Sequence, residues 1–309
     1  MSDFVVPSPP LTVVRSRARR LRRTISAYVR LTKPRVIELL LVTTVPAMVL
    51  AANGLPPLDL VVAVLAGGAL AAGGANTINC WIERDLDQLM RRTRHRPLPA
   101  REILPLPALG FGLALEVVAF GLLWAAAGLL AAGLAIGATL FYVFVYTIWL
   151  KPRSAQNIVI GGAAGAVPVL VGWAAVTGSL AAPAWVLFAV VFCWTPPHFW
   201  ALAIRYHDDY AAAGFPMLPV VKGTAVATRQ IVAYSVVVVA VSLTLPFLAA
   251  SGLLYVIAAA LLGVALVAEA LRLWREPTVE RAIRMFMFSN TYLALLFVAV
   301  AVDTLVRTS

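Results

Sequence analysis

Residues 59–87 read DLVVAVLAGGALAAGGANTINCWIERDLD, an apolar run that ends abruptly in a charged segment. An apolar run of ~20 residues is what an α-helix needs to cross a hydrocarbon core about 30 Å thick. Backbone groups inside lipid must bond within their own segment or close a barrel, and this run lacks the period-two alternation of a barrel strand. The stretch therefore predicts a transmembrane helix with polar side chains at one end.

Apolar runs of this kind recur along the chain, which has 309 residues, 61% of them hydrophobic and 13% charged. The charged share is about half that of an ordinary globular domain, which excludes a protein solvated on all sides. We expect a basic N-terminal segment over residues 1–35 and one membrane domain over residues 36–309. The predicted fold is all-α, with nine transmembrane helices around a central cavity, at residues 36–54, 59–82, 104–124, 126–149, 156–178, 182–205, 229–250, 252–273 and 286–306.

The net charge of +11 indicates membrane topology and no nucleic-acid partner. Of the 25 Lys and Arg residues, nine precede the first span and fifteen lie in the connections after spans two, four, six and eight. The positive-inside rule then predicts a multi-pass inner-membrane protein with a cytoplasmic N-terminus and a periplasmic C-terminus. A mitochondrial inner membrane is the alternative. The segment from Arg15 to Arg35 is interpreted as a retained anchor and not a transit peptide, since no cleavage signal is recognisable.

The polar end of the second span carries the first candidate site. Asn79, Glu83 and Asp87 are spaced by four residues and would form one helical stripe about 12 Å long. Hard oxygen ligands of this kind suit Mg²⁺, which proteins hold with few carboxylates plus substrate phosphates. One acid here would be an ordinary helix end. Three polar residues at one spacing, followed by Arg92 and Arg96, favour a site for a metal ion with a polyanion such as diphosphate.

Two further charged segments are expected at the same membrane face. Arg205, Asp208 and Asp209 follow the sixth span, and Lys151 and Arg153 follow the fourth. The acids could bind metal, or they could cap a helix and balance nearby arginines. The cations could bind diphosphate, or they could only enforce topology.

The first, third and sixth spans each contain an ionisable residue of interest. Glu116 is the deepest, and it is either functional or protonated and hydrogen-bonded inside the bundle. Glu38 is interpreted as structural, with Lys33 or Arg35 as its partner. His198 follows a pair of prolines in the sixth span, where a lone histidine is either a satisfied core residue or a ligand contact.

Several stretches, in chain order, resemble the intramembrane UbiA-type prenyltransferase superfamily and, within it, the protohaem IX farnesyltransferase family. The first site departs from the superfamily pattern Asn-x-x-x-Asp-x-x-x-Asp only by Glu83, which keeps a carboxylate. The second site, usually Asp-x-x-x-Asp, here begins with Arg205. The stretches are residues 31–38, 79–87, 92–98, 157–168, 172–173, 194–202 and 214–220.

This resemblance implies farnesyl transfer from farnesyl diphosphate to a vinyl carbon of haem B, with water addition giving haem O. It implies Mg²⁺ as cofactor, the lipid bilayer as surroundings, and a downstream haem-modifying or oxidase-assembly protein as a partner. The implied catalytic residues are Asn79, Glu83, Asp87 and Asp209, and the implied metal ligands are these four with Asp208. The implied diphosphate ligands are Arg92, Arg96, Lys151, Arg153 and Arg205. The implied acceptor contacts are His198, Trp173 and Trp200.

Three other functions remain open from the residues alone. A prenyltransferase for another aromatic acceptor, such as a hydroxybenzoate or quinone precursor, would use the same metal chemistry. A transporter would place its site near the midplane on broken helices, often between inverted repeats, and no paired repeat is recognisable. A purely structural subunit would need no cluster of carboxylates and arginines.

Overall fold

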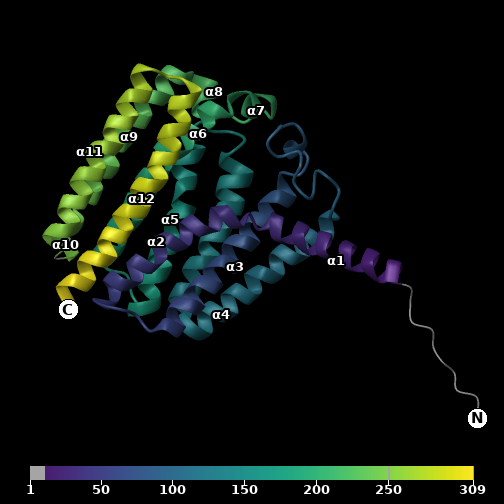
Figure 1. Ribbon diagram of the computed structural model, residues 1–309, viewed down its shortest axis with the longest axis horizontal. Coiled ribbons are helices and arrows are strands. Elements are labelled where there is room, and N and C mark those ends of the chain that lie inside the picture. Colours follow the sequence, from purple (N-terminus) through teal and green to yellow (C-terminus); the bar gives the residue numbers. More distant parts are fainter. Residues whose placement is uncertain (1–10, 250, 309) are drawn as a thin grey trace, which may run out of the picture.

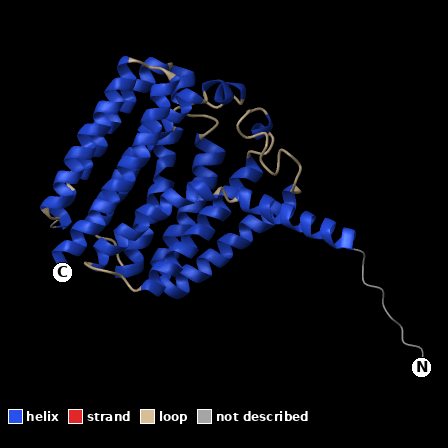
Figure 2. Ribbon diagram, viewed as in Figure 1, coloured by secondary structure: helices blue, strands red, loops and turns tan. Residues whose placement is uncertain are grey.

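The computed structural model describes residues 11–249 and 251–308, without the side chains of residues 11–18 and 35–41. This part of the chain contains helices and loops and no strand, and its long helices form one bundle (Figures 1 and 2). The helices are α1 (Leu11–Leu31), α2 (Pro34–Ala52), α3 (Leu58–Ile82), η1 (Leu86–Gln88), α4 (Pro105–Leu140), η2 (Phe141–Leu150), α5 (Asn157–Thr177), α6 (Ala182–Arg205), α7 (His207–Ala212), α8 (Leu218–Lys222), α9 (Thr224–Ser242), α10 (Leu245–Ala249), α11 (Leu253–Arg275) and α12 (Val279–Thr308).

The order of these helices agrees with the nine predicted spans. Among the described residues, seven helices are long and apolar enough to cross a membrane, and one of them, Pro105–Leu150, covers the third and fourth predicted spans together. The first predicted span corresponds to α2, of which Val42–Ala52 is the described apolar part. The chain is thus an all-helical, multi-pass membrane protein, while its predicted central cavity stays a prediction.

The turn between the third and fourth spans differs from the expected one. The sequence suggested a tight connection at residues 125–127, whereas these residues are helical and the break lies at Gly128, with φ 84° and ψ 168°. A residue with a side chain rarely adopts a positive φ of this kind, so the chain reverses at the first glycine after the alanines.

Close packing between α3 and α4 depends on small residues, as the glycines of the second span predicted. A Cβ atom added to Gly74 would lie only 2.9 Å from the carbonyl oxygen of Gly112. Beside this contact, Oε1 of Glu116 accepts a hydrogen bond of 3.0 Å from the Thr139 hydroxyl, across the break in α4. Glu116 therefore belongs to the helix packing, although its Oε2 has no partner among the described residues.

The polar connections gather at one end of the bundle. Residues 83–104, 151–156 and 206–223 lie together at the top of Figure 1, whereas α10 and the C-terminus lie at the opposite end. The loops also touch directly, because Lys151 pairs with Glu83 and Asp209 bonds to the backbone of residues 91 and 92. The expectation that these charged loops share one membrane face agrees with this arrangement.

The basic N-terminal segment contains a helix of its own. Helix α1 extends sideways beyond the bundle in Figure 1, and the chain then turns at Lys33, whose φ is 53°, into α2. Its last turns are held by Ala27 and Leu31, which are buried against Cys80, Leu98 and other apolar residues. The end of α1 is thereby attached to the polar end of α3.

At the opposite end, one carboxylate joins the last two helices. Asp303 of α12 is almost fully buried and accepts hydrogen bonds from the backbone N–H groups of Gly252 and Tyr255 at 2.7 and 3.1 Å, and Arg307 donates to it at 3.1 Å. These N–H groups have no partner within α11, because the first turn of a helix leaves its donors free. Asp303 therefore caps α11 from a neighbouring helix.

Replacing Asp303 by valine is expected to lower the free energy of unfolding by about 1–3 kcal/mol, because buried donors lose their acceptor. The measurement is thermal unfolding of the full-length protein in detergent. The control is Asp59→Val, which removes an exposed carboxylate from the first turn of α3. Equal stability of the two variants would contradict the capping role.

Candidate active site

The three residues of the predicted stripe lie at the polar end of α3. Asn79 belongs to the last turn of α3, Glu83 is its C-terminal cap, and Asp87 lies in the short helix η1. All three are buried, with exposed fractions of 2, 4 and 0%. The helix ends at Ile82, so Asp87 does not continue the same α-helical stripe. The main chain nevertheless makes one more helical turn there, because the Asp87 N–H donates to the Glu83 carbonyl. The three groups are thus buried, and the helix that carries them is shorter than expected.

Glu83 forms an ion pair with Lys151, which comes from the loop after η2. Burial alone would raise the pKa of Glu83, but the charges of Lys151 and Lys33 outweigh it and hold that pKa below its usual value. Burial likewise opposes the charge on Lys151, while Glu83 outweighs it and raises the pKa of the lysine. Both groups are therefore charged at neutral pH.

Asp87 is paired with Arg96 from the same loop. One guanidinium nitrogen of Arg96, Nη1, donates to both carboxylate oxygens at 2.9 and 2.8 Å. Although burial opposes its charge, the attraction of Asp87 raises the pKa of Arg96. The Thr93 hydroxyl donates to the Asp87 carbonyl at 2.9 Å, which closes the loop around the pair.

Asn79 differs from the other two members of the stripe, because among the described side chains its basic partner, Lys33, forms no ion pair with a carboxylate. The Lys33 ammonium donates to its Oδ1 at 2.8 Å, and its Nδ2 donates to the Thr147 hydroxyl at 3.2 Å. Burial lowers the pKa of Lys33, and its nearest hydrogen-bonding partner is a neutral amide. An anionic ligand beside Lys33 would therefore favour the charged form of this lysine, which burial disfavours.

Sequence reasoning missed Lys33 and Thr147 as site residues. Lys33 or Arg35 was expected to pair with Glu38, a prediction that lies outside the described residues because the Glu38 and Arg35 side chains are not among them; within the described residues Lys33 donates to Asn79. One signal was present in the sequence. Lys33 is the only lysine in an N-terminal segment otherwise rich in arginine, and it directly precedes the proline that begins α2.

The helix η2 supplies the opposite wall of the site. Its ten residues form a π-helix, a wider turn that is rare and often found at functional sites. Tyr142 and Tyr146 stack there with ring centroids 5.4 Å apart, and Thr147 and Lys151 follow toward the polar end. Lys151 also lies 4.6 Å from the ring centroid of Phe215, so aromatic faces surround the cation on two sides.

Asp209 joins the second predicted segment to the first. Its carboxylate oxygens accept hydrogen bonds from the backbone N–H groups of Arg91 and Arg92 at 3.2 and 3.1 Å. The Arg92 guanidinium lies over the rings of Tyr206 and Tyr210, at 5.1 and 5.8 Å from their centroids. Asp209 and Arg92 therefore reach the same mouth as the stripe, where the carboxylate holds the arginine-rich loop against α7.

Three other predicted charges lie at the outer edge of the mouth. The Asp208 side chain is fully exposed and pairs with His207. Arg205 is exposed beside the Tyr206 ring, at 5.5 Å from its centroid. Arg153 is also exposed and donates to the carbonyls of residues 148 and 149, where it satisfies the end of η2. Asp208 and Arg153 thus have local partners and point away from the buried pairs.

The predicted acceptor contacts lie deeper in the bundle. His198 is buried between the Trp194 and Phe286 rings, with centroids at 4.3 and 4.4 Å, and its Nδ1 lies 2.8 Å from the Ser289 hydroxyl oxygen. It is seven residues, or about 10 Å of helix, from the polar end of α6. Trp173 and Trp200 are both buried, and their indole N–H groups have no partner among the described residues.

The donor set of the stripe suits a hard cation. Within the described residues, no three His, Cys, Asp or Glu side chains meet as a metal cluster. Instead an amide oxygen and two carboxylates lie in sequence order along one wall, and each is paired with a basic side chain: Asn79 and Glu83 with lysines of other segments, Asp87 with an arginine of its own loop. Oxygen donors are those that Mg²⁺ prefers, and the three cations suit the phosphate oxygens that complete its shell. The predicted Mg²⁺ ligands stay a prediction.

Comparison with known sequences identifies the family. The UbiA prenyltransferase family matches residues 40–292. The chain belongs to this family. Similar UbiA proteins include the protoheme IX farnesyltransferases of Parafrankia sp. (strain EAN1pec), with 53% identity over 96% of both chains, and of Frankia alni, with 54% identity over 91% of this chain and 99% of the relative. That of Nostoc sp. (strain PCC 7120) is 50% identical over 91% and 89%.

Solved structures show the same UbiA fold. A chain from a structural study of the biosynthesis of digeranylgeranylglyceryl phosphate synthase in membranes aligns with a TM-score of 0.74 and 18% identity, over 91% of this chain and 98% of that one. A UbiA homolog from Archaeoglobus fulgidus bound to GPP and Mg²⁺ aligns with a TM-score of 0.62 and 19% identity, over 89% and 99%. These likenesses confirm the arrangement of helices.

Proposed function

We propose that this chain transfers the farnesyl group of farnesyl diphosphate to a vinyl group of protohaem IX, with addition of water, and so produces haem O and diphosphate. Relatives at 50–54% identity over most of the chain carry the name protoheme IX farnesyltransferase, which supports this acceptor. The observation that carries the proposal is the half-buried Lys33, whose ammonium group donates to a neutral amide at the mouth of the bundle.

The mouth binds the diphosphate through its cations. Lys33, Lys151 and Arg96 lie along the stripe, and Arg92 lies above it on the tyrosine rings. Two buried carboxylates face three half-buried basic side chains, so an anionic ligand would balance the positive charge that the carboxylates leave uncompensated. Arg205 and Arg153 at the rim attract the diphosphate from solution.

Asn79, Glu83 and Asp87, with Asp209, are the proposed ligands of Mg²⁺, which supplies charge neutralisation for the leaving diphosphate when bound. The cationic side chains around them stabilise the negative charge that develops as the farnesyl C1–O bond breaks. The vinyl electrons then form a bond to C1, and water adds to the other vinyl carbon with loss of a proton. Asp208 completes the ligand set only if α7 turns inward.

The bundle interior receives the two apolar substrates and excludes water from the allylic cation. His198 is the best placed of the proposed haem contacts, because it lies among aromatic rings one or two turns below the mouth. Trp173 and Trp200 have buried indole N–H groups that a bound acceptor could use. In this proposal residues 36–309 form one domain in the bacterial inner membrane. The N-terminus is cytoplasmic and the C-terminus is periplasmic. A haem-modifying protein acts downstream as a partner.

The test is incubation of membranes containing the protein with farnesyl diphosphate, Mg²⁺ and haem B, followed by mass spectrometry. We expect haem O in the wild type and none with Glu83→Gln. Removal of Mg²⁺ by a chelator should likewise stop the reaction. Prenylation of a hydroxybenzoate without any haem product would show that the acceptor is wrong while the prenyl donor is right.

A further inference from the structure

Helix α1 carries two exposed stripes of opposite character. Its apolar stripe consists of Leu21, Ile25 and Val29, which are spaced by four residues and are 61, 55 and 51% exposed. Its basic stripe consists of the exposed residues Arg19, Arg22, Arg23, Ser26 and Arg30. At 100° per residue the two stripes lie side by side, and the third face packs on the protein. An amphipathic helix of this kind typically lies in a membrane interface.

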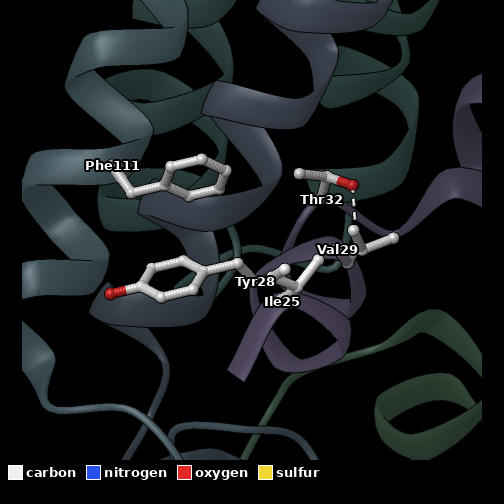
Figure 3. A pocket seen from close by; sticks show the side chains of 5 residues that line it. All are labelled: Ile25, Tyr28, Val29, Thr32 and Phe111. Carbon is white, nitrogen blue, oxygen red and sulfur yellow. Dashed lines mark hydrogen bonds between the residues drawn. The ribbon is translucent and has the colours of Figure 1, made fainter. Parts of the chain in front are cut away.

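An apolar hollow separates α1 from α4. It is lined by Ile25, Tyr28, Val29 and Thr32 of the α1 end and by Phe111 of α4, and the Tyr28 and Phe111 rings meet edge to face with centroids 4.9 Å apart (Figure 3). Phe111 lies in the second turn of a membrane-spanning helix, so this hollow lies at the depth where acyl chains begin.

A second, polar hollow lies on the adjacent, basic face of α1. Its lining includes Arg19, Arg22, Arg23 and Arg30, together with Glu102 of the loop before α4. Glu102 pairs with Arg30, and among the described residues the other three arginines form no ion pair. Three uncompensated cations therefore lie next to an apolar hollow at the membrane surface.

We propose that α1 and the start of α4 form a binding site for an anionic phospholipid. The phosphate of its headgroup lies among Arg19, Arg22 and Arg23, and the upper part of an acyl chain lies in the apolar hollow, against Ile25, Val29 and the contacting rings of Tyr28 and Phe111. Charge complementarity selects the anionic headgroup, because each arginine near an anionic surface contributes attraction that a zwitterionic lipid lacks. The site lies outside the diphosphate mouth and does not depend on the proposed reaction.

The test is native mass spectrometry of the full-length protein in detergent, with equimolar dioleoyl phosphatidylglycerol and phosphatidylcholine. We expect the wild type to retain phosphatidylglycerol in preference to phosphatidylcholine. The triple variant Arg19→Gln, Arg22→Gln, Arg23→Gln should lose that preference by roughly a hundredfold. Ile25→Asn with Val29→Asn should reduce the retention of both lipids, since it makes the hollow polar.

The matched control removes the same charge from elsewhere on the polar face. Arg229, Arg275 and Arg284 are exposed, and their replacement by glutamine should leave the preference unchanged. Retained preference in the α1 triple variant, or equal loss in the control, overturns the proposal. Displacement of the lipid by an equal concentration of inorganic phosphate would show a phosphate site instead. Loss of a dimer with unchanged lipid retention would show that a second copy covers α1.

Discussion

Replacing Lys33 by methionine is expected to lower kcat/KM for farnesyl diphosphate by about 10²–10³-fold, the usual cost of losing one preorganised group that stabilises developing negative charge. Lys33 donates to Asn79 from a half-buried position, and among the described side chains no carboxylate is its direct partner. Its charge is therefore available for the diphosphate, more so as the C1–O bond breaks. We expect the loss mainly in kcat, measured by haem O formation in membranes.

Lys222→Met is the matched control, because Lys222 is an exposed lysine at the end of α8. It should change kcat/KM less than twofold. Methionine keeps the length of the Lys33 side chain and leaves no unpaired carboxylate behind, so the variant should unfold at nearly the wild-type temperature. Wild-type activity in a folded Lys33→Met protein would exclude Lys33 from the site.

Replacing Lys151 by methionine is expected to lower the free energy of unfolding by about 3–5 kcal/mol, because the buried Glu83 loses its ion-pair partner. The side chains of Lys151 and Glu83 are only 12 and 5% exposed, so water cannot compensate the carboxylate. The measurement is thermal or denaturant unfolding of the full-length protein in detergent. The control is Arg281→Met, which breaks an exposed pair with Glu276 and should cost about 0–1 kcal/mol.

The double variant Lys151→Met, Glu83→Gln separates folding from function. Removing both charges should restore most of the lost stability, since no buried charge is left unpaired. Haem O formation should stay absent, because the proposed site has lost a metal ligand and a diphosphate ligand together. A double variant that is as unstable as Lys151→Met, or one that regains activity, would refute this account of the pair.

Much of the fold follows from local sequence. Each apolar run of ~20 residues must be helical in lipid, whatever its neighbours are. The break at Gly128 was displaced by one residue from the expected turn, because several consecutive small residues can all end a helix and only the backbone geometry distinguishes them. The sequence indicated α1 only as a basic segment, because its apolar stripe is short and its apolar residues alternate with arginines.

The site was predicted in part. The stripe of Asn79, Glu83 and Asp87 was recognisable because its members lie at one helical spacing within nine residues. Their partners were not, because pairing depends on which loops meet. Lys33 and Thr147 reach Asn79 from 46 and 68 positions away in the chain, and the backbone of residues 91 and 92 reaches Asp209 from more than a hundred.

By itself the sequence determined that this chain crosses the membrane as helices, that its charges collect at one face, and that an amide and two carboxylates mark the polar end of the second span. Those properties depend on hydrophobicity and on spacing within one segment. Only the tertiary structure decided that Glu83 pairs with Lys151, that Asp87 pairs with Arg96, and that Lys33 faces Asn79. The reason is physical: the energy of a buried charge depends on what lies within a few ångströms of it, and those neighbours are set by how a loop folds or by contacts with distant parts of the chain.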